Sequence, residues 1–157
     1  AFNLPVEKGF HDDAFAYVLG EMILPLVEDF APDAIFLQCG ADALAEDPLA
    51  RLALSNGAHR AAVRALRPMA PRLIVSGGGG YNPWSVARCW SLVWAELAGK
   101  EVPDHLPTDA QAILRRLYWH RKGRPSEAML TTLADAPRGG AIPDGLRRDV
   151  AALRARL

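Results

Sequence analysis

The stretch Arg72–Tyr81 reads Arg-Leu-Ile-Val-Ser-Gly-Gly-Gly-Gly-Tyr and carries the strongest fold signal in the chain. A short apolar run typical of a strand ends at four consecutive glycines, and Tyr81 is the first side chain after them. Glycine adopts positive φ freely and has no Cβ, so four in a row between a strand and a helix indicate a bare backbone wall beside a site. Asn82-Pro83 then opens a helical pattern.

A second apolar run, Ala34–Cys39, ends in a similar way, because Gly40-Ala41-Asp42 follows it. Ligands of an open parallel sheet bind at the carboxyl ends of its strands, so we expect Asp42 and Tyr81 to share one crevice. There Asp42 would be a metal-binding carboxylate or a catalytic acid or base, and the phenol of Tyr81 would donate to a charge developing on a substrate oxygen. Two structural alternatives stay open: Asp42 as a turn former or helix cap, and Tyr81 as a cover for the core edge.

Composition bounds the class of protein. The chain has 157 residues, 50% of them hydrophobic, which predicts one globular domain. Eighteen basic residues balance eighteen acidic ones, so no global field favours a nucleic acid or a membrane surface. Cys39 and Cys89 lack Cys-x-x-Cys spacing and lie in apolar patterns, which predicts buried free thiols in a reducing compartment. No membrane-length apolar stretch or signal segment is found, and we predict a cytoplasmic protein.

Strand and helix patterns alternate over the first hundred residues, which predicts an α/β layer. The predicted strands are Ala1–Val6, Ala34–Cys39 and Leu73–Ser76, and the two inner runs are continuously apolar, as expected when helices cover both sheet faces. The predicted helices begin at Asp12 or Asp13 with a kink at Pro25, at Ser55, at Asn82, at Thr108 and at Ser126, and a last one carries the stripe Leu146, Val150, Leu153 and Leu157.

Other chemistries find less support in the sequence. The glycine run lacks the Lys-Ser/Thr of a P-loop, and Asn82 occupies the last glycine position of a dinucleotide fingerprint. The four histidines are scattered and we predict that each is exposed. The stretch Arg115–Arg124 mixes basic and aromatic residues, which could bind single-stranded nucleic acid, but a solvated helix end is favoured because the chain is otherwise neutral.

Several motifs together resemble the C-terminal part of the histone deacetylase superfamily. They are Gln38-Cys39-Gly40-Ala41-Asp42, Glu46-Asp47-Pro48-Leu49, Gly77–Asn82 and Ala87-Arg88-Cys89-Trp90. Leu92–Leu97 and the exit from Val102-Pro103 to Leu106-Pro107 resemble most its bacterial acetoin utilisation branch. The resemblance covers about residues 1–107, which would be the C-terminal part of the catalytic domain, and residues 108–157 would form a helical extension.

This resemblance implies the C-terminal portion of a three-layer arginase/deacetylase-type parallel sheet, and zinc-dependent removal of acyl groups from lysine or polyamine-like amines. Asp42 matches a zinc-binding aspartate of the family. Tyr81 matches the tyrosine that donates a hydrogen bond to the substrate carbonyl. Gly79 and Gly80 match the glycine wall beside the acyl-lysine tunnel.

The family pattern also needs an Asp-x-His pair and a His-His pair, and neither is present in this chain. Catalytic zinc takes about three protein ligands, so the chain is expected to be a fragment that is inactive alone and that partners the missing N-terminal portion of the domain. We also expect an exposed apolar edge and self-association. The alternatives are a non-catalytic α/β interaction or assembly module and, on the glycines alone, a nucleotide-binding module.

Overall fold

The centre of the fold is a parallel pair of strands. In this computed structural model, which describes residues 1–121 and 123–156, β1 (Ile35–Gln38) pairs with β2 (Leu73–Ser76). Ile35 lies opposite Leu73 and Gln38 opposite Ser76, so both strands end at the same edge of the sheet, as the sequence predicts. Lys122 of the basic stretch and Leu157 of the last apolar stripe lie outside the described residues.

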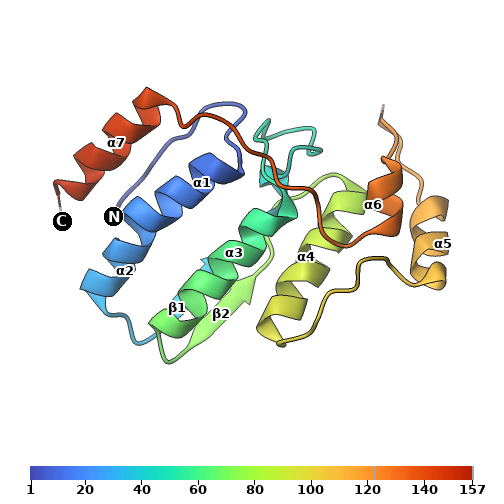
Figure 1. The fold of residues 1–157 in the computed structure, drawn as a ribbon, viewed down its shortest axis with the longest axis horizontal. Coiled ribbons are helices and arrows are strands. Elements are labelled where there is room, and N and C mark those ends of the chain that lie inside the picture. The colour runs from blue at the N-terminus through green and yellow to red at the C-terminus, as the bar shows by residue number, and fades with distance from the viewer. Residues whose placement is uncertain (122, 157) are drawn as a thin grey trace.

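Two helices cover one face of this sheet. Helix α3 (Asn56–Leu66), followed by a 3₁₀ turn at Arg67–Met69, and helix α4 (Pro83–Leu97) lie on the same side (Figure 1). The inward side chains of the strands and helices form one apolar cluster, which contains Leu37, Cys39, Val63, Val75, Val93 and Leu97. Burial of this helix-facing side of the sheet is what fixes α3 and α4 in place.

The opposite face of the sheet is uncovered. Phe36 and Ile74, which are partners in the strand register, expose 69% and 60% of their surface. Within residues 1–121 and 123–156, no helix covers them. The prediction that helices cover both faces is therefore wrong for these residues, although the apolar sequence of both strands is the one expected of a fully buried sheet.

The first predicted helix is present but divided into segments. Helix α1 (Asp12–Val18) continues through a π-helical turn at Leu19–Ile23 into α2 (Leu24–Phe30). Pro25 lies in the first turn of α2, where its missing N–H is tolerated. The distortion predicted near Pro25 takes the form of the π-helical turn that precedes α2.

The cap of α1 is His11, not Asp12 or Asp13 as predicted, and its Nδ1 accepts from the Ala14 N–H at 3.3 Å. The two aspartates bind more distant segments instead. Asp12 accepts from the N–H groups of Ser55 and Arg138, each at 2.8 Å.

The two ends of the chain pack against each other. Residues 1–6 form no strand, contrary to the prediction; Leu4 and Val6 instead pack on a cluster that includes Val18 and Val150. Val150 belongs to α7 (Asp144–Arg154), which lies beside α1 and α2 (Figure 1). The last predicted helix therefore completes the core around the first one.

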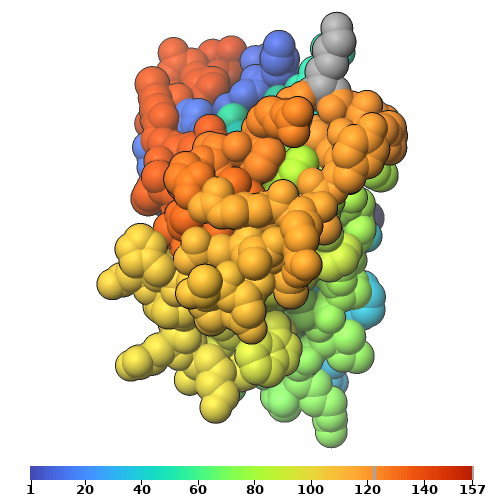
Figure 2. Space-filling view, turned by 90° about the vertical axis from the view of Figure 1, so that its right-hand side faces the viewer, coloured from blue at the N-terminus to red at the C-terminus, as the bar shows by residue number. Residues whose placement is uncertain are grey.

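The segment between α4 and α7 packs against the N-terminal half of α4. It contains α5 (Thr108–Arg116) and α6 (Glu127–Thr131), and Figure 2 shows this orange part of the chain facing the viewer. Helix α5 begins at Thr108, as predicted, and Pro107 precedes it without a side-chain cap. Trp119 packs edge-on against Trp84 with ring centroids 5.9 Å apart.

A buried ion pair fastens the end of this segment to the helical layer. Arg88 of α4 is 2% exposed as a side chain, and its Nη1 lies 2.6 Å from Asp135 Oδ1. Asp135 also accepts from the Asn56 N–H at 3.0 Å, at the start of α3, and its own N–H donates to Asn56 Oδ1 at 2.9 Å. Asp135 thus joins the start of α3 to the N-terminal half of α4.

Candidate functional site

The segments that follow β1 and β2, residues 39–42 and 77–81, run side by side beyond the sheet, and we call them the strand exits. The Ala41 N–H donates to the Gly79 carbonyl at 2.6 Å, which continues the contact after β1 and β2 have ended. A methyl group placed on Gly78 would come 2.9 Å from the Cα of Gly40. This close backbone contact explains why small residues occupy both exits.

Asp42 lies at the first bend of one exit. It belongs to a 3₁₀ turn at Ala41–Ala43 and is half-buried. A methyl group on Gly79 would lie 2.6 Å from Asp42 Cγ, and one on Gly40 would lie 2.6 Å from Asp42 Oδ1. The structure thus packs the Asp42 carboxylate directly against the glycine run, as proximity of the two strand exits requires.

The glycine run has one position that requires glycine for its backbone. Gly80 has φ +148, a conformation that other residues rarely adopt, and a Cβ there would come 2.7 Å from Val86 Cγ2 and 2.9 Å from Ala41 Cβ. At the other end of the run, the indole of Trp90 packs against Gly77 and donates its Nε1–H to the Cys39 carbonyl at 2.9 Å. The run is held between side chains rather than forming a flexible connector.

Tyr81 follows the run with its backbone fixed and its side chain accessible. Its N–H donates to Asp47 Oδ2 at 2.8 Å, and the residue is 48% exposed. The next residue, Asn82, caps α4 as predicted, with Oδ1 accepting from the N–H groups of Trp84 and Ser85. A half-exposed side chain in this position is accessible to a ligand.

His59 lies beside the site, and the prediction that it is exposed is wrong. Only 8% of its surface is exposed, and its Nε2 lies 2.8 Å from the Gly40 carbonyl. Because a carbonyl can only accept, Nε2 carries the proton, and Nδ1 has no partner among the described residues. His59 therefore holds the backbone two residues before Asp42.

Both cysteines are buried free thiols, as predicted. Burial raises the pKa of Cys89 to about 12, with smaller effects from nearby charges, and burial likewise raises the pKa of Cys39. Thiols with raised pKa values are not activated nucleophiles. Neither cysteine supplies chemistry at the site.

The donor set for a metal is incomplete in this chain. Across residues 1–121 and 123–156, no three His, Cys, Asp or Glu side chains gather where they could hold a metal ion. Asp42 offers one carboxylate at a strand exit, a suitable single ligand for zinc, whereas a catalytic zinc takes three. These residues alone do not build a zinc centre.

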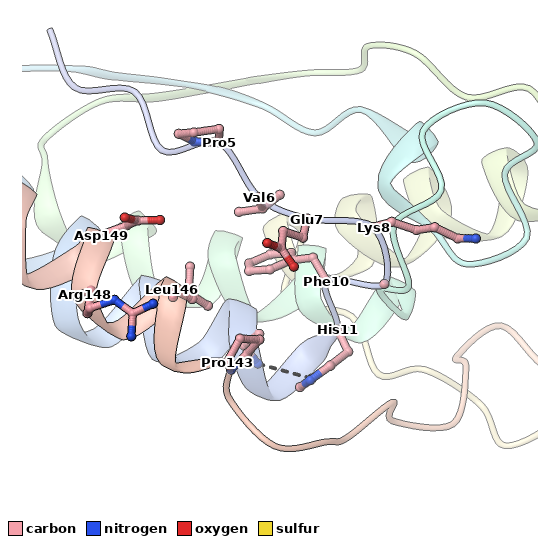
Figure 3. A pocket seen from close by; sticks show the side chains of 13 residues that line it. Pro5, Val6, Glu7, Lys8, Phe10, His11, Pro143, Leu146, Arg148 and Asp149 are labelled. Carbon is pink, nitrogen blue, oxygen red and sulfur yellow. Dashed lines mark hydrogen bonds between the residues drawn. The ribbon is translucent and has the colours of Figure 1, made fainter.

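The larger cavity lies away from these residues. It has a volume of about 300 Å³ and lies between the N-terminal segment and α7, where Glu7 and Phe10 face Leu146 and Arg148 (Figure 3). A smaller cavity of about 200 Å³ touches Gly40 and His59, between the end of β1 and α3. Asp42 and Tyr81 line neither of them.

Comparison with known proteins agrees with this geometry. Residues 1–97 match the histone deacetylase domain family. Putative histone deacetylase 2 of Caenorhabditis elegans and histone deacetylase 9 of Arabidopsis thaliana are each 39% identical over 107 residues, which is 68% of this chain but 21% and 25% of those proteins. A crystal structure of a histone deacetylase homologue from Aquifex aeolicus superimposes with a TM-score of 0.85 at 34% identity.

That superposition covers 98% of this chain and 42% of the homologue. A homologue complexed with SAHA gives a TM-score of 0.86 at the same identity and coverage. The α/β architecture is thus that of the arginase/deacetylase fold. This chain belongs to the histone deacetylase family, and it spans about a quarter or less of the length of the two curated relatives described above.

Two residues beside the site escaped the sequence interpretation. Asp47 precedes a proline, which is a strong turn signal, but nothing in the sequence indicates its contact with Tyr81. The arginines beside His59 on α3 favour an exposed position for it. The spacing of Ala58, Ala62 and Leu66 along the same helix was the signal for a buried face nearby.

Proposed function

We propose that this chain supplies part of the catalytic site of a zinc-dependent deacetylase that hydrolyses acyl groups from lysine or polyamine-like amines. Asp42 would provide one metal ligand, and Tyr81 would donate its phenol O–H to the substrate carbonyl. Gly79 and Gly80 would line the passage for the acylated amine. The observation that carries this proposal is the hydrogen bond from Ala41 to Gly79, which joins the strand exits and sets the Asp42 carboxylate against the glycines before Tyr81.

The chemistry divides between a metal and this chain's own residues. Zinc, when bound, would polarise the amide carbonyl and lower the pKa of a water molecule. Tyr81 would act on the opposite side of the carbonyl, because a phenol hydrogen bond strengthens as negative charge develops on the oxygen. Removal of one such donor typically lowers kcat by about 10²–10³-fold.

The remaining zinc ligands and the general base would come from residues outside this chain. The uncovered face at Phe36 and Ile74 supports that proposal, since such an apolar sheet face is expected to be covered in a complete domain. We also propose that the chain belongs to the acetoin utilisation branch, because Leu92–Leu97 and the exit from Val102-Pro103 to Leu106-Pro107 resemble that branch most. Buried free thiols at Cys39 and Cys89 support a reducing compartment such as the cytoplasm.

Complementation would test the proposal. The 157-residue chain is mixed with zinc and a separately expressed N-terminal portion of the deacetylase domain, and hydrolysis of an acetyl-lysine peptide is measured. Hydrolysis that disappears in Asp42→Ala is the expected result. Binding of the two portions with no hydrolysis would instead favour the alternative, a non-catalytic assembly module, for which the exposed Phe36–Ile74 face is the supporting observation.

A nucleotide site at the glycines is disfavoured by charge. Asp42 lies where a phosphate would approach Gly79, and two negative groups at that distance repel each other. Addition of ATP or a dinucleotide should leave the Tm of the chain unchanged. A clear rise in Tm would revive this alternative.

A further inference from the structure

Asp47 is a buried carboxylate whose two oxygens bind two different loops. The residue is 7% exposed. Its Oδ1 accepts from the N–H groups of Leu49 at 2.8 Å and Ala50 at 3.4 Å, within its own loop. Its Oδ2 accepts from the Tyr81 N–H at 2.8 Å, 34 positions away in the sequence. The first contact shapes a turn, whereas the second reaches the residue that carries the proposed donor.

The backbone is held both before and after Tyr81. Asn82 Nδ2 donates to the Glu46 carbonyl at 3.1 Å, so consecutive residues of the loop bind consecutive residues of the Tyr81 segment. Before Tyr81, Gly80 packs against Ala41 and Val86 so tightly that no Cβ fits. The side chain of Tyr81 nevertheless stays 48% exposed. The contacts therefore fix where the side chain begins and leave its far end free.

We propose that Asp47 is a positioning residue, which fixes the Tyr81 backbone so that the phenol O–H meets the substrate carbonyl. This inference rests on the proposed function of Tyr81. A catalytic donor must be preorganised, since a misplacement of about 1 Å can cost about 10²-fold in rate. Charged acceptors form the stronger hydrogen bonds to backbone N–H groups, which explains a carboxylate at this position.

The substitution Asp47→Asn removes one of the two acceptor oxygens. The remaining oxygen is expected to stay with the turn, where the N–H groups of Leu49 and Ala50 both meet it. The NH₂ group of the asparagine then faces the Tyr81 N–H, donor against donor. The matched control is Glu46→Gln, the same chemical change one position earlier. The side chain of Glu46 pairs with Arg138, so this control removes a charge from the same loop while keeping the Asp47–Tyr81 contact.

The first test is hydrogen exchange of the Tyr81 amide, measured by NMR in this chain without any activity assay. In Asp47→Asn the exchange rate of that amide should rise at least about tenfold, because an unpaired N–H opens more easily. Amides in the middle of α4, such as Cys89 and Leu92, should keep their rates. Unchanged exchange at Tyr81, or an equal rise throughout α4, would overturn the inference.

The second test is a double-mutant cycle in the active deacetylase that carries these residues. Asp47→Asn should lower kcat at least about tenfold with KM within about twofold, and it should add little to the loss in Tyr81→Phe, because both changes remove one interaction. Glu46→Gln should keep kcat. Losses that multiply in the double variant would show that Asp47 does not act through Tyr81. If Tyr81→Phe alone keeps full turnover, the proposed role of Tyr81 fails, and the inference fails with it even where amide exchange confirms the backbone contact.

Discussion

The carboxylate of Asp42 packs directly against the backbone of Gly79. Any side chain on Gly79 would have to displace it, because even a methyl group would come 2.6 Å from Asp42 Cγ. Asp42 and Gly79 thus pack against each other in the segments that follow β1 and β2. This contact makes the orientation of Asp42 depend on the size of the residue at position 79.

The substitution Gly79→Ala should therefore weaken zinc binding in the active deacetylase. Changes that reorient a metal ligand typically cost about 10–100-fold in metal affinity, and we expect a loss in that range from a competition titration with a chelator. Gly20→Ala is the control, since a Cβ there meets no atom within 4 Å. Equal zinc affinity in both variants would contradict the role given to Asp42.

Arg88→Ala should destabilise the chain strongly. The change removes a buried cation and leaves Asp135, whose side chain is 11% exposed, without its partner, and breaking such a pair typically costs about 3–5 kcal/mol of unfolding free energy. Arg154→Ala removes an exposed pair with Glu21 and should cost no more than about 1 kcal/mol. Urea unfolding followed by circular dichroism measures both variants. A similar small loss of unfolding free energy in the two would show that the ion pair between Arg88 and Asp135 does not stabilise the packing on α4.

Glu96 should make stability fall at acidic pH. Hydrogen bonds from Arg64 and Arg60 lower the pKa of its carboxyl to about 2, from an ordinary value of 4.5. A lowered pKa in the folded state adds stability above pH 4.5, and that stability is lost as the pH falls from about 4.5 through about 2.

The control is Glu96→Gln, which removes the titrating group. It should be less stable than the parent at pH 7 and should show a smaller decline between pH 5 and pH 2. The midpoint of urea unfolding across that range gives the comparison. Parallel declines in the parent and in Glu96→Gln would rule out Glu96 as the source.

The uncovered sheet face should make the chain self-associate. Phe36→Ser combined with Ile74→Ser removes the two large apolar side chains from that face and should raise the dissociation constant of any self-association at least about tenfold. Ile113→Ser is the control, because Ile113 is 56% exposed but lies on α5. In sedimentation velocity, a monomeric parent, or a larger effect from the control, would disprove this prediction.

Local signals predicted the elements that bear the site. Asn82 and Pro83 mark the start of α4. The Asn82 side chain caps the helix, and a proline is tolerated in the first turn because the N–H that it lacks would have no partner there. Glycines after two apolar runs correctly predicted adjoining strand exits. These features depend on residues close together in the chain, which is why the sequence reveals them.

Features that depend on distant contacts were not predictable. Asp12 and Asp13 are residue types that often cap helices, but here His11 caps α1. The two carboxylates instead accept hydrogen bonds from distant N–H groups, those of Ser55, Arg138 and Gly140. Asp47 has a turn signal that hides its second contact, to Tyr81. Phe36 has the sequence environment of a covered strand, yet the residues described here cover only the other face.

The most direct test of the account is turnover and zinc content of Tyr81→Phe in the active deacetylase. Loss of a single phenol O–H should lower kcat for an acetyl-lysine peptide by about 10²–10³-fold, while the zinc content stays equal to that of the parent. Asp42→Ala in the same assay should lose the zinc as well. Turnover of Tyr81→Phe within about twofold of the parent would contradict the claim that Tyr81 and Asp42 act on one substrate carbonyl.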